Sequence, residues 1–190
     1  MTSLTHMESA RLRLRPLEDN ERDAAFILAI VNDPEWLRFI GDRKIHDLAS
    51  SRTYIEGTRA MITKYGHGML AVDRVDDAGH AVAIGTCGLL KRDTLEHPDI
   101  GYAFLAAHTG HGYAREAVTA LLASADAAGV ERVLAIVKPD NERSKRVLAF
   151  AGFSFMHMTE MNGESLELHQ RARSDAISAT SDPTRPSRAR

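Results

Sequence analysis

The pattern of apolar and polar positions divides the chain into short strands and amphipathic helices. Residues 11–15 read Arg-Leu-Arg-Leu-Arg and alternate with a period of two, which predicts a strand with one buried face that ends at Pro16. Apolar residues recur at helical spacing over residues 18–33 and again over 46–66, and residues 34–41 predict a short helical turn between these helices. The N-terminal third is therefore expected to be one strand followed by helices.

The pattern changes after residue 67. Three runs rich in β-forming residues follow and predict an antiparallel meander, at residues 68–75, 81–90 and 99–105. The remaining pattern predicts a helix, a buried strand, a second helix and a hairpin that turns at Asn-Gly, at residues 113–128, 132–137, 141–151 and 153–170. This order predicts an α+β domain with a mixed sheet, because helices and strands do not alternate regularly.

The residues after this hairpin are rich in Ser, Pro and Arg and poor in apolar side chains. Such a composition cannot bury enough apolar surface to order a segment. We therefore expect one domain over residues 8–172 and a disordered tail over residues 173–190.

The charge and composition exclude several classes of partner. The 190-residue chain has a formal net charge of −2, so no basic surface for nucleic acid or membrane is expected. It has one cysteine, Cys87, expected to be a buried structural thiol, and its histidines lack metal-ligand spacing, so no metal is expected. It shows neither an apolar signal segment nor a spanning apolar run, which favours a cytoplasmic location.

The stretch "HTGHGYAREA" at residues 108–117 is the first candidate for chemistry. Gly110 and Gly112 allow backbone conformations closed to other residues, and a helix follows at once, so its unpaired first amides could bind an anion. No Lys-Ser/Thr follows as in a P-loop, and the third glycine of the dinucleotide fingerprint is absent. The glycines alone fit two interpretations, a phosphate cradle or a simple helix start.

A second candidate lies about thirty residues further on, in "KPDNERSKRVLAFAGF". Asn141 stands where a strand gives way to a helix, and Ser144 lies one turn later. Asn141 could be an ordinary N-cap and Ser144 a solvated residue of the first turn. Taken singly, neither residue identifies a site.

Four stretches taken together resemble the GNAT superfamily of acetyl-CoA-dependent N-acetyltransferases. More narrowly, they look like the branch that contains the RimJ/RimL-type ribosomal-protein N-terminal acetyltransferases. The stretches are "ESARLRLRPLEDNERDA", "AIGTCGLL", "IGYAFLAAHTGHGYAREA" and "NERSKRVLAFAGF", and the resemblance covers about residues 8–171. It implies the GNAT fold, with a mixed sheet of six to seven strands flanked by helices.

The resemblance also assigns roles to residues of this chain. The CoA pyrophosphate would be bound by backbone amides at Thr109, Gly110, His111, Gly112, Tyr113 and Ala114. Main chain at Phe104 and Leu105, in a strand that a bulge would splay from its neighbour, would bind the pantetheine arm and polarise the thioester carbonyl. Asn141 would bond the same arm, and Ser144 would be a proton donor to the leaving thiolate.

Several positions depart from the family pattern. The tyrosine that serves many members as general acid, seven residues after the asparagine, is Leu148 here, and a glutamate used as base in some members is Ile136. Ala107 and Thr109 replace a Gln/Arg and a Trp, which removes side-chain contacts but no backbone amide. Asp99 remains as a candidate base or acceptor-binding group, although it could also be a charge at a strand edge.

The expected function is direct transfer of acetyl from acetyl-CoA, as co-substrate, to a primary amine. The amine could belong to a protein N-terminus or to a small molecule. A free α-amine has a pKa of roughly 7.7–8.0, whereas that of a lysine is near 10.4, so the missing glutamate favours an amine of low pKa. The alternatives are a CoA-binding member with degenerate catalysis and an interaction domain that binds no CoA. A homodimer formed through the closing strands is compatible with the sequence.

Overall fold

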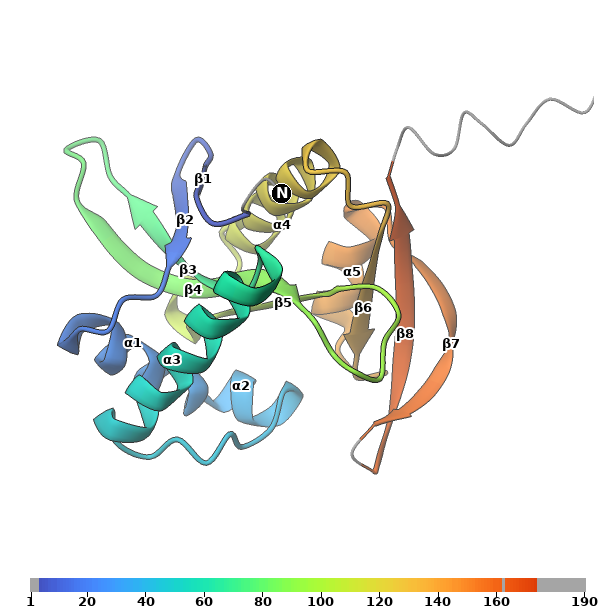
Figure 1. Ribbon diagram of the computed structural model, residues 1–190, viewed down its shortest axis with the longest axis horizontal. Coiled ribbons are helices and arrows are strands. Elements are labelled where there is room, and N and C mark those ends of the chain that lie inside the picture. Colours follow the sequence, from blue (N-terminus) through green and yellow to red (C-terminus); the bar gives the residue numbers. More distant parts are fainter. Residues whose placement is uncertain (1–3, 162, 174–190) are drawn as a thin grey trace, which may run out of the picture.

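Eight strands form one mixed sheet in the computed structural model of the protein, which describes residues 4–161 and 163–173. The sheet order is β1-β2-β3-β4-β5-β6-β8-β7, and β5–β6 is its parallel pair (Figure 1). The strands are β1 (Met7–Glu8), β2 (Leu12–Pro16), β3 (Met69–Val75), β4 (Ala81–Leu90), β5 (Asp99–Phe104), β6 (Arg132–Val137), β7 (Ser154–Met161) and β8 (Glu164–Ala172).

The helices begin and end where the sequence carries capping residues. Asn20 and Asp47 accept hydrogen bonds from the first turns of α1 and α3, and Gly66 ends α3 in the left-handed conformation. The helices are α1 (Glu21–Val31), α2 (Pro34–Phe39), α3 (Leu48–Tyr65), α4 (Tyr113–Ala127) and α5 (Glu142–Phe150), with the 3-10 turn η1 (Ala106–His108) before α4.

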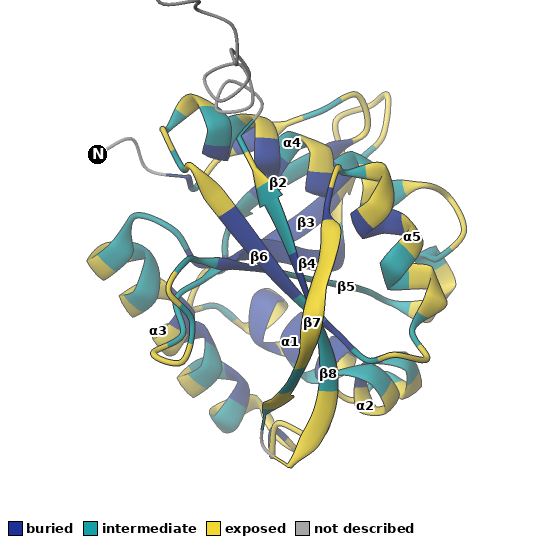
Figure 2. Ribbon diagram, turned by 90° about the vertical axis from the view of Figure 1, so that its right-hand side faces the viewer, coloured by how far each residue is buried: buried dark blue, intermediate teal, exposed yellow. Residues whose placement is uncertain are grey.

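The helices cover the two faces of the sheet with separate groups of apolar side chains. Alternation along β3 places Leu70 and Val72 against the α4–α5 side, whereas Ala71 faces α1 and α3. Strand β6 is buried within the sheet, while β7 at its outer edge is largely exposed (Figure 2). The site described below lies where these two layers meet at β5.

The predicted architecture is confirmed, with one correction. The meander β3–β4–β5, the buried strand β6 and the closing hairpin β7–β8 are all present. The sheet has eight strands rather than six to seven, because Met7 and Glu8 pair with Leu14 and Arg13 as an added edge strand, a segment too short to show periodicity.

Two further expectations concern the C-terminal tail and membrane-spanning helices. The expected disordered tail lies outside the described residues except for Arg173. None of the helices in the described ranges is long and apolar enough to cross a membrane.

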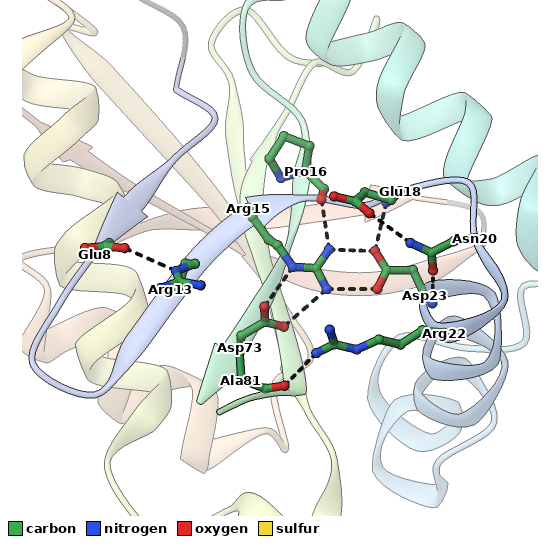
Figure 3. Close-up of polar contacts among 10 residues, drawn as sticks. All are labelled: Glu8, Arg13, Arg15, Pro16, Glu18, Asn20, Arg22, Asp23, Asp73 and Ala81. Atoms are coloured by element: carbon green, nitrogen blue, oxygen red, sulfur yellow. Dashed lines mark hydrogen bonds and ion pairs between the residues drawn. The ribbon is translucent and has the colours of Figure 1, made fainter. Parts of the chain in front are cut away.

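A buried ion-pair network joins strands β2 and β3 to helix α1 (Figure 3). Arg15 on β2 donates to both carboxylate oxygens of Asp23 on α1, at 2.6 and 2.8 Å, and to Asp73 on β3 at 2.7 Å. Asp23 and Asp73 are 0% and 2% exposed in their side chains. Burial acts to raise the pKa of Asp23, but bonds from Arg15 and the Glu18 amide outweigh it and hold that pKa below its ordinary value.

Replacing Arg15 with Leu should lower the free energy of unfolding by about 3–5 kcal/mol, because two buried carboxylates lose their partner. Urea unfolding at neutral pH measures this loss. Arg13→Leu is the matched control on the same strand, because Arg13 makes only an exposed pair with Glu8 and its loss should cost at most about 1 kcal/mol. Equal losses for the two variants would contradict a structural role for the network.

Candidate active site

A pocket of about 880 Å³ opens where β5 and β6 separate. The two strands are paired at one position, Asp99 opposite Leu134, and diverge from there towards Phe104. Their backbone groups beyond this point face a gap instead of a partner strand. Nine of the eleven predicted site residues line the pocket, and the other two, Leu105 and His111, do not.

The glycine stretch forms the expected turn and helix start. Gly110 and Gly112 have φ of +83° and +81°, and Gly112 is the N-cap of α4 without any side-chain capping bond. Among the described residues, the amides from Gly110 to Arg115 have no hydrogen-bond acceptor. Thr109 differs, since its amide already donates to the Ala106 carbonyl at 3.2 Å. The turn therefore presents unpaired amides at the positive end of a 15-residue helix, which is an anion site.

Arg11 fixes the orientation of this turn, a role that the sequence did not reveal. Its guanidinium donates to the His111 carbonyl at 3.2 Å and lies 4.6 Å from the centroid of the Tyr113 ring. Because C=O and N–H point in opposite directions across a trans peptide, holding this carbonyl turns the Gly112 amide away from Arg11. Glu116 holds Arg11 in turn, through an ion pair of 2.6 Å, and its carboxylate is thereby occupied.

The main chain of β5 offers one free edge to the pocket, at Phe104. The Leu105 amide donates to the Ile84 carbonyl at 3.0 Å, and its carbonyl accepts from His108, so Leu105 is already paired. Alternation along the strand then points the amide and carbonyl of Phe104 to the opposite edge, towards the gap. The predicted backbone contact is thus narrowed from two residues to Phe104.

The gap needs no bulge in β5. The β4–β5 register runs without a shift from Asp99 to Phe104, and the ring of Phe104 lies over Gly85, where an added Cβ would come within 2.5 Å of it. Strands β5 and β6 separate instead because their pairing ends and because the chain then enters the turn η1. The expected bulge in this strand was wrong, and Gly85 is needed for close packing.

Asn141 and Ser144 lie together at the start of α5, next to Tyr102, which was not predicted as a site residue. The Asn141 side-chain oxygen accepts from the Ser144 amide at 3.0 Å, so the N-cap interpretation holds, while its amide nitrogen stays available in the pocket. The Ser144 hydroxyl lies 2.8 Å from the hydroxyl of Tyr102 on β5. Burial raises the pKa of Tyr102 far above its ordinary value, so this phenol keeps its proton.

Tyr102 thus places a phenol in the site although the tyrosine position of the helix is Leu148. The stretch "IGY" was noted in the sequence, but nothing in it reported that a β5 side chain reaches the first turn of α5. Only the three-dimensional pairing of these elements shows the contact.

Asp99 lies at the position where β5 and β6 separate. It is 3% exposed in its side chain, and both its oxygens accept from the Arg92 Nε, at 2.9 and 3.0 Å. Burial raises the pKa of the Asp99 carboxyl, and the nearby charge of Arg92 opposes part of this rise. Asp99 is therefore a buried, ion-paired carboxylate in the pocket wall at the first residue of β5, which is compatible both with a role as base and with a structural charge at the strand end.

The candidate acid and base face opposite sides of the sheet. Ile100 packs in the cluster with α4 and α5, whereas Ala103 and Leu105 pack with α1–α3. Alternation assigns Tyr102 to the α5 side, in agreement with its bond to Ser144, and assigns Asp99 to the α1–α3 side. A group held in the gap between β5 and β6 is thus accessible from both faces.

Cys87 is buried, and burial raises the pKa of its thiol strongly, so it stays protonated and unreactive as expected. The described residues hold no group of three or more His, Cys, Asp or Glu arranged to bind a metal ion.

Comparisons with known proteins agree on one family. Residues 11–154 match the Acetyltransf_3 family, described as "Acetyltransferase (GNAT) domain". The chain is 26% identical over 177 residues to the uncharacterized protein YkkB of Bacillus subtilis, covering 90% of this chain and 98% of YkkB.

Solved structures share the fold. A putative GnaT-family acetyltransferase from Bordetella pertussis superposes with a TM-score of 0.73 at 25% identity, covering 88% of this chain and 99% of that one. A RimL ribosomal alpha-N-protein acetyltransferase in complex with coenzyme A superposes with a TM-score of 0.64 at 15% identity, covering 86% and 95%. At that identity the second likeness shows the fold alone.

Adding a carboxylate to the turn should abolish anion binding there. Gly112→Asp places a negative charge at the unpaired amides, so stabilisation by CoA, measured as the shift of the thermal midpoint, should disappear. Gly79→Asp is the control, because Gly79 has a similar φ of +84° in the β3–β4 turn and does not line the pocket. An unchanged shift in Gly112→Asp would show that the glycines serve only as a turn.

Proposed function

Because the chain belongs to the GNAT acetyltransferase family, we propose that it transfers acetyl from acetyl-CoA to a primary amine by direct attack. The observation that carries this proposal is the gap between β5 and β6, which has an anion cradle at one end and a candidate acid and base on opposite faces. The relative of this fold bound to coenzyme A supports the choice of cofactor.

The residues present fit coenzyme A. The amides from Gly110 to Ala114 would bind the pyrophosphate, and Arg115 and Arg146 line the same pocket with guanidinium groups for phosphate oxygens. These two arginines were not predicted as site residues. The Phe104 main chain and the Asn141 side-chain amide would hold the pantetheine arm in the gap, which leaves the thioester accessible from both faces.

In the proposed reaction a neutral amine attacks the thioester carbonyl from the α1–α3 side. A bond forms between the amine nitrogen and the acetyl carbon, and the carbon–sulfur bond breaks. The attacking nitrogen gives its proton to Asp99, directly or through water, and the leaving thiolate takes a proton from Ser144. The Phe104 amide donates to the carbonyl oxygen as negative charge develops there.

Tyr102 is a positioning residue in this scheme. Its hydroxyl donates to the Ser144 carbonyl oxygen at 3.2 Å and lies 2.8 Å from the Ser144 hydroxyl, so it contacts Ser144 at two atoms. Since its pKa is raised, it keeps a proton that can replace the one lost by Ser144. The Tyr102–Ser144 pair would do the work of the single tyrosine that Leu148 replaces.

The direct test of the proposal is release of the CoA thiol in the presence of a panel of primary amines. We expect amine-dependent release together with mass-spectrometric detection of the acetylated amine. Tight CoA binding without transfer to any amine would instead favour a member with degenerate catalysis.

Ser144→Ala should lower kcat by about 10²–10³-fold, the usual contribution of a general acid, with little change in the KM for acetyl-CoA. Tyr102→Phe should lower kcat in the same direction but less, also with an unchanged KM and an unchanged thermal midpoint. Ser124→Ala, on α4 away from the pocket lining, is the control and should keep full activity. Full activity in both site variants would rule out the proposed proton donor.

A further inference from the structure

The pocket wall has more cationic side chains than carboxylates to pair with them. Each carboxylate that lines it is paired with a lining cation: Asp99 with Arg92 at 2.9 Å, Glu164 with Lys138 at 2.9 Å and Glu35 with Arg143 at 3.1 Å. Four lining cations remain without a carboxylate partner among the described residues: Arg43, Lys91, Arg115 and Arg146. The empty pocket thus carries an excess of positive charge.

These four cations fall into different parts of the pocket. Arg115 and Arg146 belong to α4 and α5, beside the cradle, where the phosphates of the cofactor would neutralise them. Lys91 donates to the carbonyls of Leu95 and Glu96. Arg43 lies in the α2–α3 connection, on the face from which the amine would approach, and no phosphate of the cofactor would reach that face.

The nearest acidic neighbour in sequence does not neutralise Arg43. The carboxylate of Asp42 accepts from the Lys44 amide at 2.7 Å and makes ion pairs with Lys44 and His46, at 3.5 and 3.9 Å. Arg43 and the Tyr54 hydroxyl belong to the same pocket wall, and burial raises the pKa of the Tyr54 phenol while the charge of Arg43 opposes this rise. Within the described part of the chain this hydroxyl has no hydrogen-bond partner either.

Aromatic side chains form a large part of this face. Trp36 and Phe39 of α2 line the pocket with Tyr54 of α3. Trp36 is 5% exposed, and its indole nitrogen has no partner among the described residues. An apolar, aromatic wall with an unpaired guanidinium and an unpaired hydroxyl is suited to a ligand that has an apolar body and an anionic group.

Building on the proposed function, we propose that the acceptor is a primary amine that also carries a carboxylate, which binds Arg43 with the Tyr54 hydroxyl beside it. The carboxylate could belong to a free amino acid or to an acidic residue near a peptide N-terminus, since both present the same chemistry. Polycationic amines are disfavoured, because every lining carboxylate is already occupied and Arg43 would repel further positive charge.

The test compares acceptors of matched size that differ in this charge, with kcat/KM calculated for the neutral amine, because a neighbouring carboxylate also raises the pKa of the amine. One arm uses L-phenylalanine against L-phenylalaninamide, a second uses a peptide with Glu at position two against the same peptide with Gln, and spermidine represents polycations. We expect the acid of at least one pair to have a kcat/KM about tenfold to hundredfold higher than its amide, as for a charge-assisted hydrogen bond. The arm that shows the preference identifies the source of the carboxylate.

Arg43→Gln should remove this preference by raising the KM for the acid, with the amide affected little and CoA stabilisation unchanged. Lys44→Gln is the matched control, because Lys44 is the next residue, is exposed and does not line the pocket. Equal kcat/KM within both pairs, a preference for spermidine, or a preference that survives in Arg43→Gln would overturn the proposal. If no amine at all is acetylated, the proposed function fails instead, so the two failures are distinguishable.

Discussion

The single parallel pairing between Asp99 and Leu134 is the constraint on which the site depends. A longer β5–β6 ladder would close the gap and consume the main-chain groups of Phe104 within the sheet. With no pairing at all, β6 and the α5 helix that follows it would lose their hydrogen-bonded link to β5, and the 2.8 Å contact between Tyr102 and Ser144 would depend on side-chain packing alone. The one paired position fixes where the gap between β5 and β6 begins. Beyond it the two strands stay apart, so that a ligand can lie between them.

The sheet also has to be held rigid on the side where the N-terminal helices stand. The Arg15–Asp23–Asp73 network does this by joining β2, α1 and β3 with charges that are almost wholly removed from water. Such a network adds little net stability compared with apolar packing, but it is costly to break and accepts only one geometry. Since α1 packs with α3, and α2 follows α1 directly, the position of the aromatic wall depends on this network.

Periodicity along the chain predicted nearly all of the fold, because most helices and strands have their own apolar repeat and several helices also have a capping residue. It missed β1, where two residues give no period, and it placed a bulge in β5 by analogy where the strand is regular. The glycine turn and Asn141/Ser144 were predicted because their residue types reflect local backbone needs. Arg11 and Tyr102 were not assigned roles, because each acts across a distance that only the folded chain establishes: β2 to α4 and β5 to α5.

The excess of positive charge in the pocket wall helps to explain how a weak general base can suffice. A cation near a bound amine disfavours its protonated form and lowers its pKa, so Arg43, which has no carboxylate partner among the described residues, would shift the amine towards the neutral nucleophile. Asp99 has its own pKa raised by burial, which improves it as a proton acceptor even though Arg92 opposes the shift. The pKa of the bound amine is thus lowered and the pKa of the Asp99 carboxyl is raised, so the difference between them becomes smaller. A smaller difference reduces the free energy needed for proton transfer from the amine to Asp99. A carboxylate on the acceptor would offset part of this effect at Arg43, so the acceptor would be held by the pairing of its carboxylate with Arg43, and its amine would lose its proton to Asp99.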